Sequence, residues 1–176
     1  VIGAEKLTQW VDQEDRSTAV IFADGAGAAV VGPSDTPGIG PVVWGSAGDK
    51  ADVIYIKDRR SFIFQEGQTV FRWATTALHP VARKACERAG VDPADLDVFV
   101  PHQANLRIIE AIAKRLGADK AVIARDIVLA GNTSAASIPL ALSRMIERGE
   151  VPSGGRALLL GFGAGLTYAS QVIELP

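Results

Sequence analysis

Short runs of apolar and β-branched residues occupy the first part of the chain, and such runs are typical of strands. Thr18–Ala23 and Ala28–Val31 flank Asp24–Gly27, whose glycines can take positive φ, so the three segments together predict a hairpin. Val42–Gly45 predicts another short strand after a loop rich in glycine and proline. Two further strands are expected on either side of a charged segment, at Val53–Ile56 and Ser61–Phe64.

From Thr69 onward the apolar positions recur every three or four residues, which predicts a helix that ends at Gly90. Pro80 lacks a backbone N–H, so we expect it to kink this helix or to split it in two. Cys86 lies beside the apolar face and is expected to be a packed thiol rather than a reactive one. The apolar face consists of Val70, Trp73, Ala74, Ala77, Val81, Ala85 and Ala89.

Strands and helices alternate in the second half of the chain. One helix is expected between Asn105, which can act as its N-cap, and Gly117. A nearly all-apolar helix follows the turn Gly131–Ser134 and ends at Gly149. The expected strands are Leu96–Val100, Ala121–Ala124, Arg156–Leu160 and Leu166–Leu175. This alternation predicts an α/β layered fold with a sheet that is covered by helices.

The composition excludes several classes of protein. The chain is 48% hydrophobic and 22% charged, as in globular proteins, and no apolar run is long enough to cross a membrane. A formal net charge of −2 lacks the strongly basic balance that is typical of nucleic-acid-binding proteins. A single cysteine excludes an internal disulfide. The first residues do not resemble a signal peptide, so a cytoplasmic location is expected. The apolar start at Val1 suggests a cut within a larger fold, although processing would look the same.

Candidate chemistry is sparse. His102 follows a predicted strand at its carboxyl end, where α/β sheets bind ligands, but catalysis and a structural role stay open on this ground alone. Asn132 lies in a glycine-led turn, where an asparagine is more often a turn or capping residue. Gly161–Gly165 is similar to a dinucleotide motif, but a strand follows it where a helix is required. His79, His102 and Cys86 lack the spacing of a metal site.

Three longer motifs, Pro101–Asn105, Gly131–Pro139 and Gly161–Thr167, resemble in this order the signatures of β-ketoacyl-acyl-carrier-protein synthase III. Phe22–Ala28 is similar to a hairpin of that family, and Gly67–Phe71 to the start of its long helix. Thiolases and elongating synthases carry a second histidine where this chain has Asn132.

The resemblance implies a thiolase-like layered αβαβα fold that is made of two similar halves. Residues 1–176 would form the C-terminal half, and the N-terminal half, which carries the cysteine nucleophile, would be absent. Cys86 does not match that nucleophile. The segment around Lys57 is shorter than is usual in the family.

By the same resemblance, the enzyme condenses a short acyl-CoA with malonyl-acyl-carrier protein in a decarboxylating Claisen reaction. His102 and Asn132 would donate hydrogen bonds to the enolate oxygen. The backbone N–H of Ala164 would complete a second oxyanion hole. CoA and phosphopantetheine thioesters are then substrates, and no metal or other cofactor is expected.

Two sets of binding residues follow from the resemblance. Gly67, Phe71, Ala104 and Asn105 would line the pantetheine tunnel. Arg72, Gln103, Arg107, Lys114 and Arg115 would bind the acidic carrier protein, although a solvated face with a Glu110–Lys114 pair is the simpler interpretation of that helix alone. The N-terminal half and a second copy of the enzyme would be further partners. A priming ketosynthase of a polyketide pathway would share every motif, whereas a non-catalytic partner subunit would be expected to lose His102 or Asn132.

Overall fold

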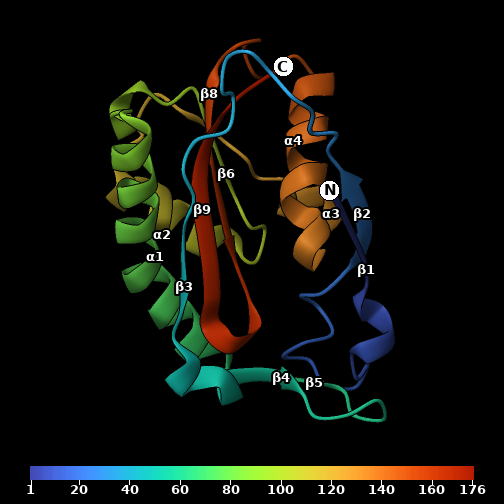
Figure 1. Cartoon of the computed structure of the whole chain (residues 1–176). Helices are drawn as coiled ribbons and strands as arrows, with labels where there is room; N and C mark the ends of the chain where they lie inside the picture. Colours follow the sequence, from blue (N-terminus) through green and yellow to red (C-terminus); the bar gives the residue numbers. More distant parts are fainter.

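The computed structural model describes residues 1–176, and at its centre lies a five-stranded mixed sheet of order β3-β9-β8-β6-β7 (Figure 1). β6 is parallel to β7 and β8, whereas β9 is antiparallel to both β8 and β3. The strands are β3 (Val43–Ser46), β6 (Val98–Pro101), β7 (Val122–Ile123), β8 (Arg156–Phe162) and β9 (Thr167–Glu174). The strands expected in the second half of the chain are therefore confirmed.

Helices cover both faces of this sheet. Figure 1 shows α1 (Gly67–Ala89) and α2 (Leu106–Leu116) on one side, and α3 (Ile127–Ala130) and α4 (Ser137–Glu147) on the other. Phe99 of β6 packs with residues of α1 and α2, whereas Val98 and Val100 pack with α4. A strand that is buried on both faces reads as a continuous apolar run, which is why β6 could be predicted. The layered α/β fold is confirmed, although the short helix α3 was not predicted.

The hairpin expected between Thr18 and Val31 is wrong. β2 (Asp24–Ala28) is a strand rather than a turn, and it pairs antiparallel with β1 (Ile2–Lys6) in a separate two-stranded sheet. Residues 18–21 form a turn, in which Thr18 Oγ1 donates to Asp15 Oδ2 at 2.6 Å.

The glycines of β2 serve a close contact with α4. A Cβ atom at Gly27 would lie 2.7 Å from the backbone nitrogen of Leu140, and one at Gly25 would lie 2.8 Å from Cγ2 of Thr133. Such distances leave no room for any side chain, so glycine is required here to let a strand approach a helix.

α1 is one continuous helix of 23 residues, so the expected division at Pro80 did not occur. Leu78 and Ala82 on either side of Pro80 are fully buried, and this packing holds the helix together across the missing backbone hydrogen bond. His79, next to Pro80, is half-buried.

The remaining elements are short. The two strands expected on either side of the charged segment are formed as β4 (Ile54–Ile56) and β5 (Ile63–Gln65), which pair antiparallel. Single turns of 3₁₀ helix link the longer elements, at Leu7–Trp10, Gly48–Val53, Pro93–Asp95, Ser134–Ala136 and Ala164–Leu166. None of the helices combines the length and the apolar character that a membrane span requires.

The contact between β2 and α4 can be tested by adding one methyl group. Gly27→Ala should lower the free energy of unfolding by about 1–3 kcal/mol, because the methyl group must displace backbone and the ring of Pro139. Gly32→Ala is the matched control, since nothing lies within 4 Å of its added Cβ. Urea unfolding measures both, and equal stability of the two variants would contradict the assigned contact.

Candidate active site

His102 lies directly after β6 and is held by three contacts, two with β8 and one with α4. Its backbone N–H donates to the carbonyl of Leu160 in β8 at 2.7 Å, which extends the parallel ladder by one residue. Its Nδ1 lies 2.6 Å from Oγ of Ser137, the first residue of α4. Phe162 at the end of β8 packs edge-to-face against the imidazole, with ring centroids 5.0 Å apart. The ring is therefore fixed in position before any substrate binds.

Burial also fixes the charge of His102. The side chain is nearly enclosed, and this desolvation lowers the pKa of His102 from 6.5 to about 4. A neutral imidazole at pH 7 carries one N–H donor and one lone pair. It can therefore donate a hydrogen bond to a developing anion without being an ion itself.

Asn132 is positioned by a short parallel bridge to Phe22. Its backbone N–H donates to Ile21 O at 3.0 Å and its carbonyl accepts from Ala23 N–H at 2.9 Å. Its side-chain Oδ1 accepts from the backbone N–H of Ser134 at 2.9 Å. Because the carboxamide oxygen is engaged, the Nδ2 group is left as the donor.

Neither donor group has a partner in the protein. Nε2 of His102 and Nδ2 of Asn132 make no hydrogen bond within the chain. Neither atom is completely buried, so both can be reached by another molecule. Four residues, 133–136, separate Asn132 from Ser137, the first residue of α4, which contacts His102. Both donors are therefore positioned near the start of α4.

Ala164 lies in the turn between β8 and β9, two residues after Phe162. Its carbonyl accepts from Thr167 Oγ1 at 3.1 Å, and Gly165 takes a φ of +69° to close the turn. Since Phe162 contacts His102, this turn lies beside the histidine. A strand follows the glycine motif, as expected, so the geometry of a dinucleotide site is not formed.

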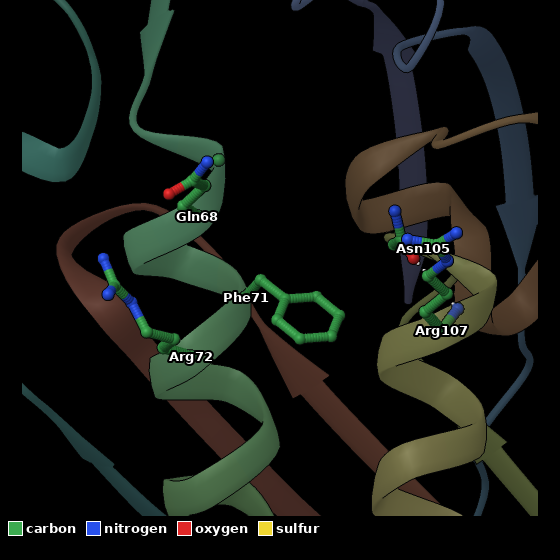
Figure 2. Close-up of a pocket in the computed structure, with 6 residues that line it drawn as sticks. Gln68, Phe71, Arg72, Asn105 and Arg107 are labelled. Carbon is green, nitrogen blue, oxygen red and sulfur yellow. Dashed lines mark hydrogen bonds between the residues drawn. The ribbon is translucent and has the colours of Figure 1, made fainter.

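A groove of about 400 Å³ opens between the first turns of α1 and α2 (Figure 2). Figure 2 shows Phe71 pointing from α1 toward α2, where Asn105 accepts from Arg107 N–H at 2.9 Å and caps the helix. The lining residues are Gly67, Gln68, Phe71, Arg72, Asn105 and Arg107.

Most of the predicted substrate-binding residues therefore meet in one groove. Gly67, Phe71 and Asn105 line it, whereas Ala104 precedes the lining residue Asn105 without lining the groove itself. Gln68 was missed, although its spacing of three residues from Phe71 places both on one face of α1.

The residues predicted to bind a carrier protein separate into two groups. Arg72, Arg107 and Lys114 are exposed and take part in none of the ion pairs, and the Glu110–Lys114 pair is not formed. Arg115 instead donates to the backbone carbonyl of Thr75 and so joins α2 to α1.

The prediction that Gln103 binds a carrier protein is wrong, because this residue is only 1% exposed. Its Nε2 donates to Pro101 O at 2.7 Å and its Oε1 accepts from the backbone N–H of Ile127 at 3.1 Å. The carboxamide is thus used to join β6 to α3, and it cannot reach the surface of another protein.

Cys86 is a packed thiol, as expected. It is fully buried within the core between α1 and the sheet, and this burial raises the pKa of the Cys86 thiol to about 11. A thiol that stays protonated at neutral pH and is enclosed by apolar side chains is not a nucleophile.

The fold is shared with solved condensing enzymes. The priming β-ketosynthase of the R1128 polyketide biosynthetic pathway matches with a TM-score of 0.95 and 48% identity, over 100% of this chain and 56% of that one. β-Ketoacyl-[acyl-carrier-protein] synthase III of Thermus thermophilus matches with a TM-score of 0.92 and 39% identity, over 100% of this chain and 58% of that one. The architecture is thiolase-like.

Sequence relatives narrow the class further. Residues 86–175 match the C-terminal family of 3-oxoacyl-[acyl-carrier-protein (ACP)] synthase III, and residues 1–48 match the family described as 3-oxoacyl-[acyl-carrier-protein (ACP)] synthase III. β-Ketoacyl-[acyl-carrier-protein] synthase III 4 of Streptomyces coelicolor is 55% identical over 100% of this chain and 57% of its own length. The mycobacterial enzyme of Mycobacterium avium is 51% identical over 100% of this chain and 56% of its own length.

The chain belongs to the 3-oxoacyl-[acyl-carrier-protein] synthase III family. It spans somewhat more than half the length of these relatives.

Because the pKa of His102 falls from 6.5 to about 4, stability should depend on pH in a defined window. Above pH 6.5 both the folded and the unfolded chain carry a neutral His102, so it contributes no slope. Below that pH the unfolded chain binds a proton that the folded chain excludes, and the free energy of unfolding falls until about pH 4. We expect a loss of roughly 3 kcal/mol across this window.

Urea unfolding at a series of pH values measures this loss. His102→Asn should remove the share of this slope that His102 contributes between the two pKa values, and His79→Gln is the matched control. The pKa of His79 is lowered by burial too, so that variant should remove only its own smaller share. An NMR titration midpoint of His102 near that of an exposed histidine would contradict the assignment.

Proposed function

We propose that this chain is the part of a β-ketoacyl-acyl-carrier-protein synthase III that decarboxylates a malonyl thioester and binds its carrier protein. The observation that carries the proposal is the pair of unpartnered donors, His102 Nε2 and Asn132 Nδ2, positioned near the start of α4. Each donor is fixed through its other atom, Nδ1 by Ser137 and Oδ1 by Ser134.

The chemistry requires such donors. When malonyl loses CO2, the electrons of the broken C–C bond pass to the α-carbon and onto the thioester oxygen. Two fixed N–H donors stabilise this enolate, and neither needs to be charged. The α-carbon then attacks the acyl carbon of the thioester on the enzyme's cysteine, and the backbone N–H of Ala164 holds the oxyanion that forms. When this tetrahedral intermediate collapses, the acyl C–S bond breaks and the cysteine leaves as its thiolate.

The nucleophile is supplied by a different part of the protein. The only cysteine of this chain is buried and protonated, and the relatives extend well beyond the length of this chain. An N-terminal half with a reactive cysteine accounts for both observations. Apolar side chains that stay exposed support burial against that half or against a second copy in a homodimer; they include Val1, Ile2, Val20, Val30 and Trp44. A lone free thiol fits a reducing compartment such as the cytoplasm.

The groove between α1 and α2 suits a phosphopantetheine arm. Phe71 offers an apolar wall, and Asn105 and Gln68 offer hydrogen-bonding groups. Arg72 and Arg107 stand at the same groove, close to two helix N-termini, where positive potential favours a phosphate. Arg107 and Lys114 lie seven residues apart on the exposed face of α2, which we assign as the docking surface for the acidic carrier protein.

A priming ketosynthase of a polyketide pathway is the second candidate. It is favoured by the 48% identity to the R1128 priming enzyme, and it would use the same donors. The two candidates differ in the acyl-CoA starter and in the carrier protein. A non-catalytic subunit is disfavoured, because His102 and Asn132 are both present and both oriented as donors.

The donor roles can be separated from the nucleophile by measuring the two half-reactions in the complete enzyme. His102→Ala and Asn132→Ala should each lower malonyl decarboxylation by about 10²- to 10³-fold, since each removes one donor to the enolate. Acyl transfer from acyl-CoA to the enzyme should fall much less. The double variant should lose less than the product of the two effects, because both donors serve one oxygen. If Asn132→Ala abolished acyl transfer but left decarboxylation intact, the assignment of Asn132 would be wrong.

Charge reversal tests the docking surface. Lys114→Glu should raise KM for the malonyl-carrier protein several-fold and leave KM for malonyl-CoA nearly unchanged, because Lys114 lies outside the groove that Arg107 lines. The defect should shrink at high ionic strength, since this charge is exposed. Lys84→Glu, on the exposed side of α1, is the matched control for added negative charge. Equal losses with both malonyl donors would mean that α2 is not the docking surface.

A further inference from the structure

Ser137 is a buried residue that touches the proposed catalytic histidine. It is 2% exposed, and its hydroxyl makes two contacts. Oγ lies 2.6 Å from His102 Nδ1 and accepts from the backbone N–H of Gln103 at 3.3 Å. Neither the groove residues nor the docking surface involves this hydroxyl.

The protons at this contact can be placed by counting donors and acceptors. A serine hydroxyl has one proton to donate and two lone pairs that can accept. The Gln103 N–H occupies one lone pair, and the structure offers the hydroxyl proton no acceptor other than His102 Nδ1. If Nδ1 carried the proton instead, the buried hydroxyl proton would have no partner, which is costly in an enclosed site. Ser137 therefore donates to Nδ1, and the ring proton lies on Nε2.

The Gln103 side chain holds this arrangement in place. Its amide bridges the end of β6, the end of β7 and the start of α3, through Pro101 O, Ala124 O and Ile127 N–H. The backbone N–H that reaches Ser137 belongs to this same clamped residue. The acceptor role of the Ser137 oxygen is thus set by the fold rather than by a mobile side chain.

We propose that Ser137 is a positioning residue that selects the Nε2–H tautomer of His102. Nε2, the nitrogen without a protein partner, then offers a proton rather than a lone pair to a bound molecule. His102 acts there as a hydrogen-bond donor, and Nε2 of the resting enzyme is not a general base. The catalytic consequence rests on the proposed function, whereas the tautomer itself does not.

The tautomer can be read directly by NMR. Long-range 1H–15N spectra of the ring at pH 7, with His102 assigned by its loss in His102→Asn, should show the proton on Nε2. Ser137→Ala should give a mixture of both tautomers. It should also raise the pKa of His102 slightly, because a donor to Nδ1 stabilises the neutral ring, while burial continues to hold this pKa below its ordinary value.

Two variants serve as controls for the NMR experiment. Ser137→Thr keeps a hydroxyl and should restore both signals. Ser170→Ala, which removes another buried hydroxyl that donates to Leu159 O at 2.8 Å, should change neither. A proton on Nδ1 in the wild-type protein, or an unchanged tautomer in a folded Ser137→Ala variant, would overturn the proposal.

Kinetic measurements on the complete enzyme provide a second test of the role of Ser137. Ser137→Ala should lower kcat for malonyl decarboxylation by about 10- to 100-fold, the range for loss of a group that orients a functional histidine, with little change in KM. The acidic limb of the pH profile should move to higher pH, and Ser137→Thr should recover most of the rate. A shifted tautomer with full decarboxylation would leave the role of Ser137 standing and refute the enolate-donor role of His102. Lost decarboxylation with an unshifted tautomer would refute the role of Ser137.

Discussion

β6 is buried along its whole length, and the position of His102 follows from that constraint. Val98, Phe99 and Val100 are fully enclosed between helices on both faces of the sheet, so the strand cannot slide or twist without opening two layers of packing. The ladder to β8 continues for one residue beyond the strand, through the His102 N–H. A side chain at the end of such a strand is held in place by the packing of the core. The same side chain on a loop would be held less precisely.

The same enclosure sets the protonation of two groups in opposite directions. Desolvation disfavours the charged form, so it lowers the pKa of His102 and raises the pKa of Cys86. At neutral pH the imidazole and the thiol are therefore both uncharged. For the imidazole this is useful, because a neutral ring can still donate a hydrogen bond, whereas an uncharged thiol has lost its nucleophilic form. Burial thus equips this part of the protein to stabilise an anion and prevents it from supplying the nucleophile.

The sequence predicts the second half of the chain well and the first 31 residues poorly, for a physical reason. Alternating buried strands and amphipathic helices carry their own periodicity, so β6, α2 and α4 could be located without knowing their partners. Glycine carries no such information. In β2, Gly25 and Gly27 are required by the approach of α4, a contact more than 100 residues away, and locally they look the same as a turn. The prediction of Gln103 as a docking residue was wrong for a related reason. A short motif does not indicate which of its polar side chains will be buried and hydrogen-bonded inside the protein. The contact of Ser137 with His102 could not be predicted either, since it depends on where α4 begins relative to β6.

The arginines and lysines of this chain differ in what they are free to do, and this difference locates the surface that can meet an acidic partner. Arg144 is paired with the buried Asp126 at 2.8 Å, and Arg83 donates to the C-terminal carbonyl of Leu116 in α2 at 2.8 Å. These two arginines hold helices in place, and Arg115 likewise joins α2 to α1 through its hydrogen bond to Thr75. Arg107 and Lys114 face solvent from the same helix without such partners, and their charge is available to another molecule. Because Arg107 also lines the groove, an acidic partner attracted by these charges would be brought beside that groove.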